Sequence, residues 1–82
     1  MPRHPIIVPD LGLDEITFSL WLVDVSTEVI EGDRVLELLA DGVTVDLSAP
    51  ASGTLVEIFV TEDDPIAPGQ IVGVIECEHF AS

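Results

Sequence analysis

Short runs of apolar residues recur along the chain, and each run is closed by a glycine, a proline or a polar turn. No segment repeats its apolar residues at the helical period over the ~10 residues that a helix requires. The runs are rich in β-branched residues, which favour strands. The pattern therefore predicts strands at residues 6–8, 16–25, 34–40, 43–48, 53–61 and 71–77, and two short ones at 28–30 and 65–67.

The two halves of the chain resemble each other at a constant offset, since Gly32 and Gly69 are 37 positions apart. The same offset joins Thr17 with Thr54, Phe18 with Leu55, Trp21 with Ile58, Leu22 with Phe59, Val23 with Val60, Val29 with Ile66, and Val35 with Val72. A duplicated four-strand unit can bury its apolar face against its copy. We therefore expect an all-β fold: a flattened barrel or sandwich of two four-stranded antiparallel sheets with quasi-twofold symmetry.

The predicted core follows from the apolar positions of these strands. We expect it to contain Ile16, Phe18, Trp21, Val23, Val29, Val35, Leu36, Leu38, Val45, Leu47, Leu55, Ile58, Val60, Ile66, Val72 and Val74.

Asp41-Gly42 is a hairpin signal, because it separates two strand-like runs by two residues. A type I′ turn requires positive φ at both positions, which glycine adopts freely and aspartate adopts more readily than most residues. The sequence therefore predicts a tight hairpin with its turn at Asp41 and Gly42.

Length and composition indicate one small domain spanning residues 1–82, with an ordered core at 6–77 and flexible termini at 1–5 and 78–82. The net charge is −14, and neither of the two basic residues, Arg3 and Arg34, is a lysine. Such a surface repels phosphate backbones and anionic lipids, so we expect neither nucleic acid nor membrane as a partner. With one cysteine, no long apolar run and no signal-like N-terminus, we expect a cytoplasmic location.

Several motifs, in order and at fitting spacings, carry a resemblance to a known family. They are Pro9-Asp10-Leu11-Gly12, Trp21-Leu22-Val23, Val29-Ile30-Glu31-Gly32-Asp33, Leu36-Glu37-Leu38, Val45-Asp46-Leu47-Ser48-Ala49-Pro50, Ser52-Gly53-Thr54-Leu55 and Pro68-Gly69-Gln70-Ile71. Together they resemble the lipoyl domains of 2-oxo acid dehydrogenase complexes and, more distantly, biotinyl carrier domains. The resemblance covers about residues 8–76 and implies the hammerhead fold of that family.

The resemblance also identifies a departure at the hairpin. The family tip reads Glu-Thr-Asp-Lys-Ala, with lipoic acid amide-linked to the lysine, whereas this chain has Leu39, Ala40, Asp41, Gly42 and Val43 there. Asp41 is kept and Gly42 occupies the lysine position. The resemblance therefore implies a degenerate attachment hairpin that holds no cofactor, because lipoate or biotin cannot be attached in the family's manner without a lysine.

Other residues with chemical potential favour structural roles. Glu62, Asp63 and Asp64 lack the spacing of a calcium loop and indicate a solvated turn. His4 lies at one terminus, while Cys77 and His79 lie at the other and offer two of the three or four ligands that zinc needs. No orienting group or oxyanion device accompanies the Cys–His pair, so we expect neither a metal site nor an enzyme. Trp21 fits the core better than a surface anchor.

The sequence favours a protein-interaction, regulatory or assembly module without lipoate, with a dehydrogenase-complex component as the implied partner and Leu39, Ala40, Asp41, Gly42 and Val43 as the candidate contact residues. Two alternatives stay open. The chain could be a swinging-arm carrier modified at Cys77 or at its N-terminal amine. It could also be a structural oligomer in which strands 6–8 and 71–77 form edges that pair between chains.

Overall fold

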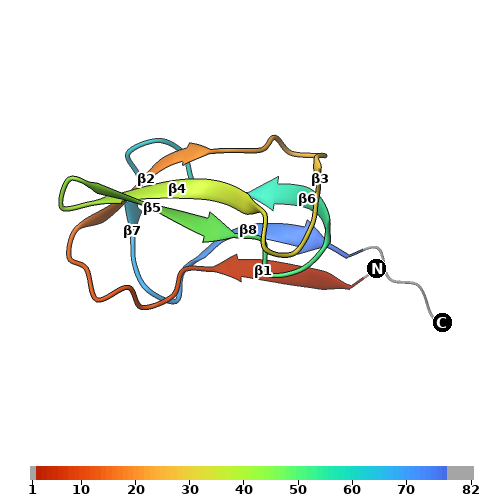
Figure 1. Cartoon of the computed structure of the whole chain (residues 1–82), viewed down its shortest axis with the longest axis horizontal. Helices are drawn as coiled ribbons and strands as arrows, with labels where there is room; N and C mark the ends of the chain where they lie inside the picture. The colour runs from red at the N-terminus through yellow and green to blue at the C-terminus, as the bar shows by residue number, and fades with distance from the viewer. Residues whose placement is uncertain (1, 78–82) are drawn as a thin grey trace.

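The computed structural model describes residues 2–77, and within them it contains eight strands and no helix. The strands are β1 (Arg3–Ile7), β2 (Ile16–Trp21), β3 (Glu28–Val29), β4 (Arg34–Ala40), β5 (Val43–Ser48), β6 (Gly53–Ile58), β7 (Pro65–Ile66) and β8 (Ile71–Glu76). They form two four-stranded antiparallel sheets, ordered β1-β8-β6-β3 (sheet A) and β5-β4-β2-β7 (sheet B). Figure 1 shows the two layers, and the all-β prediction is confirmed.

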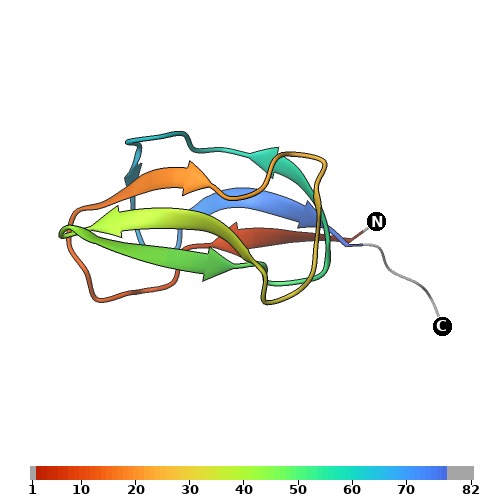
Figure 2. The same ribbon diagram turned by 45° about the horizontal axis from the view of Figure 1, so that its top comes forward.

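The strand orders of the two sheets reveal the internal repeat. Each strand of sheet A corresponds to the strand of sheet B that is four places away in the chain: β1 to β5, β8 to β4, β6 to β2 and β3 to β7. The two sheets therefore have equivalent strand orders. Each half contributes two strands to each sheet, so the halves interlock rather than stacking as separate layers (Figure 2). The predicted quasi-twofold arrangement is therefore present in the topology.

Backbone hydrogen bonds repeat at the same offset of 37 residues that the sequence shows. The amide of Phe18 donates to the carbonyl of Asp64 at 2.8 Å, and that of Leu55 donates to the carbonyl of Thr27 at 3.0 Å. The β-bulges repeat as well, because the register shifts once between Phe18 and Leu20 and again between Leu55 and Glu57. Equivalent bulges bend equivalent strands in the two sheets.

The core lies between the two sheets. It consists of Ile6, Val8, Ile16, Phe18, Val29, Val35, Leu36, Leu38, Ala40, Leu47, Ala49, Leu55, Val60, Ile66, Val72 and Ile75. Every predicted core residue is among these except Trp21, Val23, Val45, Ile58 and Val74.

A bulge, a sheet edge and a strand end explain three of these five errors. In β8 the register shift skips Val72, so alternation reverses and Ile75, not Val74, faces inward. Val45 is half-buried on a strand at the edge of sheet B. Ile58 is 40% exposed at the end of β6, opposite a glycine that cannot cover it.

Trp21 and Val23 are partly buried and pack against the core instead of lying within it. The Trp21 ring lies 5.3 Å from that of Phe18, centroid to centroid, and its Nε1 donates to the carbonyl of Val60 at 3.2 Å. The indole therefore combines an apolar contact with a satisfied polar group at the margin of the core.

The predicted strand ranges 34–40 and 43–48 are confirmed, and the others require correction. β2 and β6 end at Trp21 and Ile58, before the predicted 25 and 61, because polar turns follow in which Ser26 and Asp63 have positive φ. The other predicted ranges, 6–8, 28–30, 65–67 and 71–77, also differ at their ends from β1, β3, β7 and β8.

The chain ends and sheet edges also differ from the prediction. β1 begins at Arg3 and pairs with β8, so the core boundary predicted at residue 6 is wrong, and residues 3–5 belong to a strand. Residues 78–82 lie outside the described part.

β8 lies between β1 and β6, so the expected edge at 71–77 is wrong. β1 is an edge strand of sheet A, and β5 is the corresponding edge strand of sheet B. Residues 2–77 contain no helix long and apolar enough to cross a membrane.

Gly53 lies where two backbone segments touch. A Cβ built on this residue would overlap the carbonyl oxygen of Glu76 and lie 2.9 Å from the Cα of Cys77. Gly53 also pairs with Val29 in the short strand contact between β3 and β6. The backbone can approach this closely only because residue 53 has no side chain.

We expect Gly53→Ala to lower the free energy of unfolding by about 3 kcal/mol, since backbone must move to admit the methyl group. Gly42→Ala is the matched control, because its Cβ meets nothing within 4 Å and it should lose only about 1 kcal/mol from its positive φ. Urea unfolding of the two variants and the parent protein measures both values. A Gly53→Ala chain as stable as Gly42→Ala would contradict the close contact.

Candidate functional site

The candidate site is the turn between β4 and β5, at the end of the molecule drawn on the left in Figure 1. Ala40 pairs with Val43 across the hairpin, which leaves Asp41 and Gly42 as its two loop residues. Their φ angles are 50° and 76°. Positive φ at both positions is the signature of a type I′ turn, so the predicted hairpin is confirmed.

Four of the five candidate residues are accessible at this tip. Asp41, Gly42 and Val43 are exposed, and Leu39 is 41% exposed. Ala40 is buried and belongs to the core. Its side chain is therefore unavailable to a partner, and it acts by holding the turn against the sheet.

The strand that leads into the turn is paired on both sides. Strand β4 is hydrogen-bonded on both sides, to β2 and to β5, with Ala40 opposite both Ile16 and Val43. The Thr17 hydroxyl adds a 3.4 Å hydrogen bond to the carbonyl of Leu39. A side chain at residue 42 would nevertheless be free, because a Cβ built on Gly42 meets nothing within 4 Å.

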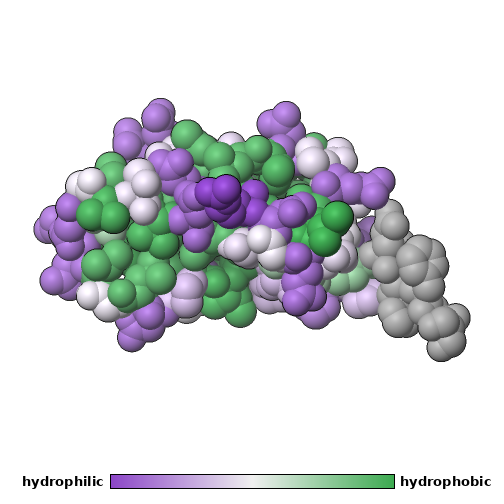
Figure 3. Space-filling model, in the orientation of Figure 1, coloured by the Kyte–Doolittle hydropathy of each residue, from purple (hydrophilic) through white to green (hydrophobic). Residues whose placement is uncertain are grey.

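Acidic residues surround the tip. Glu15 directly precedes the first residue of β2, and Ile16 pairs with Ala40 beside the turn. The loop containing Asp63 and Asp64 is joined by two backbone hydrogen bonds to Phe18, on the same strand. Figure 3 shows hydrophobic side chains among hydrophilic ones at this end of the molecule. The tip thus presents Leu39 and Val43 on opposite faces of the hairpin, with Asp41 in the turn and Glu15 beside it.

The acidic cluster at 62–64 is part of a turn. The Asp64 carboxylate accepts the Thr61 amide at 2.8 Å, and the Asp64 amide donates to the Thr61 carbonyl at 3.1 Å. Its sequence-based interpretation as a solvated turn is therefore confirmed. In the described part of the chain, no three His, Cys, Asp or Glu side chains gather as metal ligands.

Cys77 and His4 lie far from the tip. The half-buried Cys77 follows β8, and its amide donates to the carbonyl of Pro2 at 2.8 Å. This contact lies at the end of the molecule opposite the β4–β5 turn (Figure 1). His4 is exposed on β1, and His79 lies outside the described residues.

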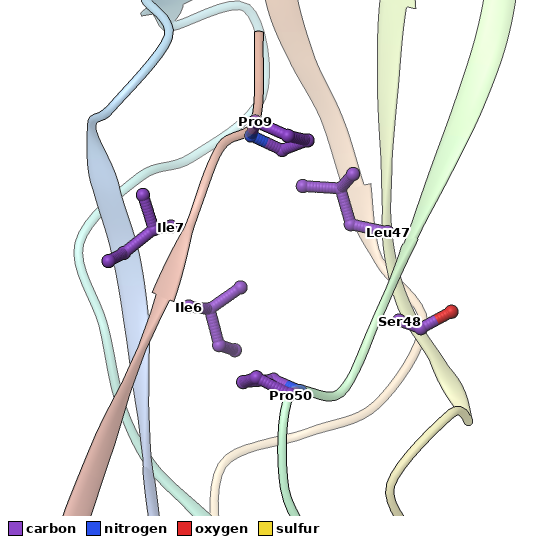
Figure 4. A pocket seen from close by; sticks show the side chains of 6 residues that line it. All are labelled: Ile6, Ile7, Pro9, Leu47, Ser48 and Pro50. Atoms are coloured by element: carbon purple, nitrogen blue, oxygen red, sulfur yellow. The ribbon is translucent and has the colours of Figure 1, made fainter. Parts of the chain in front are cut away.

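A small hollow that the sequence did not reveal lies between edge strands β1 and β5. Its volume is about 220 Å³, and it is lined by Ile6, Ile7, Pro9, Leu47, Ser48 and Pro50. Figure 4 shows Ile6 and Leu47 on opposite sides, with the two prolines at its ends. It is smaller than the ~300–1,000 Å³ of typical ligand sites and offers one polar side chain, so it lacks the groups that catalysis requires.

Comparison with known proteins places these features in context. The family model described as "Biotin-requiring enzyme", the biotin/lipoyl family, matches residues 4–75. The dihydrolipoyllysine-residue succinyltransferase component of the 2-oxoglutarate dehydrogenase complex from Bacillus subtilis (strain 168) is 38% identical over 72 residues, covering 85% of this chain and 17% of the relative. The dihydrolipoyllysine-residue acetyltransferase component of the pyruvate dehydrogenase complex from Corynebacterium glutamicum is 34% identical over 70 residues, covering 83% and 10%. The chain thus spans less than a fifth of each relative.

Two solved structures share the fold. The lipoyl domain of the 2-oxoglutarate dehydrogenase complex from Azotobacter vinelandii superposes with a TM-score of 0.66 at 18% identity, covering 93% of this chain and 96% of that domain. The urea carboxylase of Kluyveromyces lactis gives 0.78 at 21% identity, covering 93% of this chain and 6% of that protein.

The positive φ of residue 41 restricts which side chains this position tolerates. Because φ is 50° there, we expect Asp41→Val to lower the free energy of unfolding by about 1–2 kcal/mol, since a β-branched residue tolerates this region poorly. Asp41→Asn should change it by less than about 0.5 kcal/mol, since asparagine tolerates positive φ. Thermal and urea unfolding measure both, and equal stabilities would contradict the type I′ assignment.

Proposed function

The chain belongs to the biotin/lipoyl family, and we propose that it is a lipoyl-type domain that carries no lipoyl group and acts by protein recognition. It resembles the lipoyl domains of acyltransferase components of 2-oxo acid dehydrogenase complexes. The proposed role is regulatory, assembly-related or that of a decoy, and it requires no catalysis by the domain itself.

One observation supports the loss of the cofactor above all others. The relatives are named for a dihydrolipoyllysine residue, and this sequence contains no lysine. Gly42 stands at the exposed turn where the resemblance places the attachment residue, and it has no side chain. An amide-linked lipoyl or biotinyl group needs a primary amine on a flexible stem at that turn.

The tip suits recognition without a swinging arm. Leu39 and Val43 are 41% and 58% exposed on the two strands that meet at the turn, and the acidic residues Asp41 and Glu15 lie beside them. Apolar contact at the centre and charge at the rim are typical of protein interfaces. A protein partner that complements this tip presents an apolar depression with basic residues around it.

The proposed partner is a component of a 2-oxo acid dehydrogenase-type complex. The relatives that carry such a domain are components of these complexes, and the domain forms only a small part of their length. A domain that keeps the fold but lacks the arm could occupy the docking position of a lipoylated domain without passing on an acyl group.

The first test is chemical. We expect the purified chain to gain no mass when it is incubated with lipoate ligase, ATP and lipoate, or with biotin ligase, ATP and biotin, because no lysine is available. Intact-mass spectrometry reads the result. A lipoyl or biotinyl adduct on the parent chain would refute the loss of the cofactor.

Restoring the amine tests the placement of the site. We expect Gly42→Lys to accept a lipoyl group, because the side chain would enter open space, at a loss of about 1 kcal/mol of stability from its positive φ. Thr44→Lys is the matched control, since it adds the same amine to an exposed position on the same hairpin and should stay unmodified. Equal modification of both variants, or of neither, would contradict the assignment of residue 42 to the attachment position.

A further inference from the structure

The outer face of sheet A carries a group of apolar side chains, here called the β8 face: Pro5, Ile7, Phe59, Ile71 and Val74. Ile7 is 51% exposed, Phe59 55% and Ile71 46%. Strand register joins them, because Pro5 pairs with Val74 and Ile7 pairs with Ile71 on one side of the sheet. The Phe59 amide donates to the carbonyl of Val72 at 3.0 Å, which places Phe59 beside the start of β8.

Sheet B provides an internal reference for this face. In sheet B, Ser48 and Arg34 take the places of the paired residues Ile7 and Ile71. Asp46 and Glu37 take the places of Pro5 and Val74. Leu22, the counterpart of Phe59, is the one apolar residue among these equivalents. Arg34 and Asp46 form an ion pair at 3.2 Å in the middle of this face. Two further exposed apolar residues of sheet B, Leu20 and Leu39, stand opposite polar neighbours. The fold therefore does not require apolar residues at the positions of the β8 face.

The β8 face carries a small net negative charge, because one arginine contacts two glutamates there. Arg3 contacts the carboxylates of Glu57 and Glu76 at 3.5 and 3.4 Å; Arg3 and Glu76 pair at one end of the face, and Glu57 lies opposite Val74 within it. The whole sequence has a net charge of −14, so most of the excess acid lies elsewhere. This face therefore brings only a small part of the chain's excess negative charge against another copy of the chain.

We propose that the β8 face is a self-association surface through which two copies of this chain form a twofold dimer. In an isologous contact, Phe59 and Ile71 of one copy cover those of the other, and the Arg3 of each copy can meet the Glu57 or Glu76 carboxylate of its partner. Edge strand β1 forms one border of the contact, so the dimer joins sheet faces and leaves the hairpin tip free. The proposal is independent of the proposed function of the tip.

Self-association should depend on salt in a characteristic direction. Two chains of charge −14 repel each other, and this repulsion is screened as ionic strength rises. We expect sedimentation velocity of the reduced parent chain, from micromolar to millimolar concentration, to show a monomer–dimer equilibrium that shifts toward the dimer in about 1 M NaCl relative to 0.1 M. A monomer under all these conditions would overturn the proposal.

The internal repeat supplies a matched control. Phe59→Asp places a charge in the β8 face and should weaken dimerisation by more than about tenfold, since each substitution enters the contact twice. Leu22→Asp makes the same change at the equivalent position of sheet B, where the side chain is 46% exposed, and should leave dimerisation unchanged. Circular dichroism verifies that both variants are folded.

Each remaining outcome is decisive against the β8 face. A dimer that both variants weaken equally, that neither weakens, or that forms only without reductant through Cys77 would show that another contact holds the copies together. A dimer that dissociates as salt rises would show that ion pairs, not the apolar face, drive association.

Discussion

The fold depends on the pairing of strands between the two halves of the chain. Only the β2–β4 and β6–β8 pairs lie within one half; β1–β8, β3–β6, β4–β5 and β2–β7 each join the first half to the second. Neither half can complete a sheet or cover its apolar side alone. Burial of residues such as Phe18 and Leu55 therefore requires both halves at once, and strand pairing and core formation are a single event.

This dependence separates the hairpin tip from the stability of the fold. The tip is held by β4, which is paired with a strand on each side. A side chain at residue 42 would meet open space, because a Cβ built on Gly42 has no atom within 4 Å. Residues at the turn can therefore change with little effect on the core, provided that positive φ is tolerated. A scaffold of this kind can in this way change the residues of its turn and keep its fold.

The strand count, the two antiparallel sheets, the repeat and the turn at Asp41-Gly42 could be predicted from the sequence, because alternation and turn chemistry are local signals. The bulges could not, since a skipped residue such as Val72 reverses which later side chains face inward and nothing local announces it. Edges depend on strand order, so the local pattern wrongly indicates an edge at β8 and does not indicate the edge at β5. The hollow between β1 and β5 escaped prediction for the same reason, because its residues meet only once both sheets are formed.

The repeat also explains why the molecule has one tip. The counterpart of the β4–β5 turn is the junction of β8 with β1, and there the two described chain ends lie side by side, with Arg3 opposite Glu76 and the Cys77 amide on the Pro2 carbonyl. Quasi-symmetry thus places the turn and the chain ends at opposite ends of the molecule (Figure 1). A segment that continues from Pro2 or Cys77 therefore starts at the end of the molecule opposite Asp41 and Gly42. The duplication that makes the core symmetric thus gives a closed turn between β4 and β5 and an open counterpart at the chain ends.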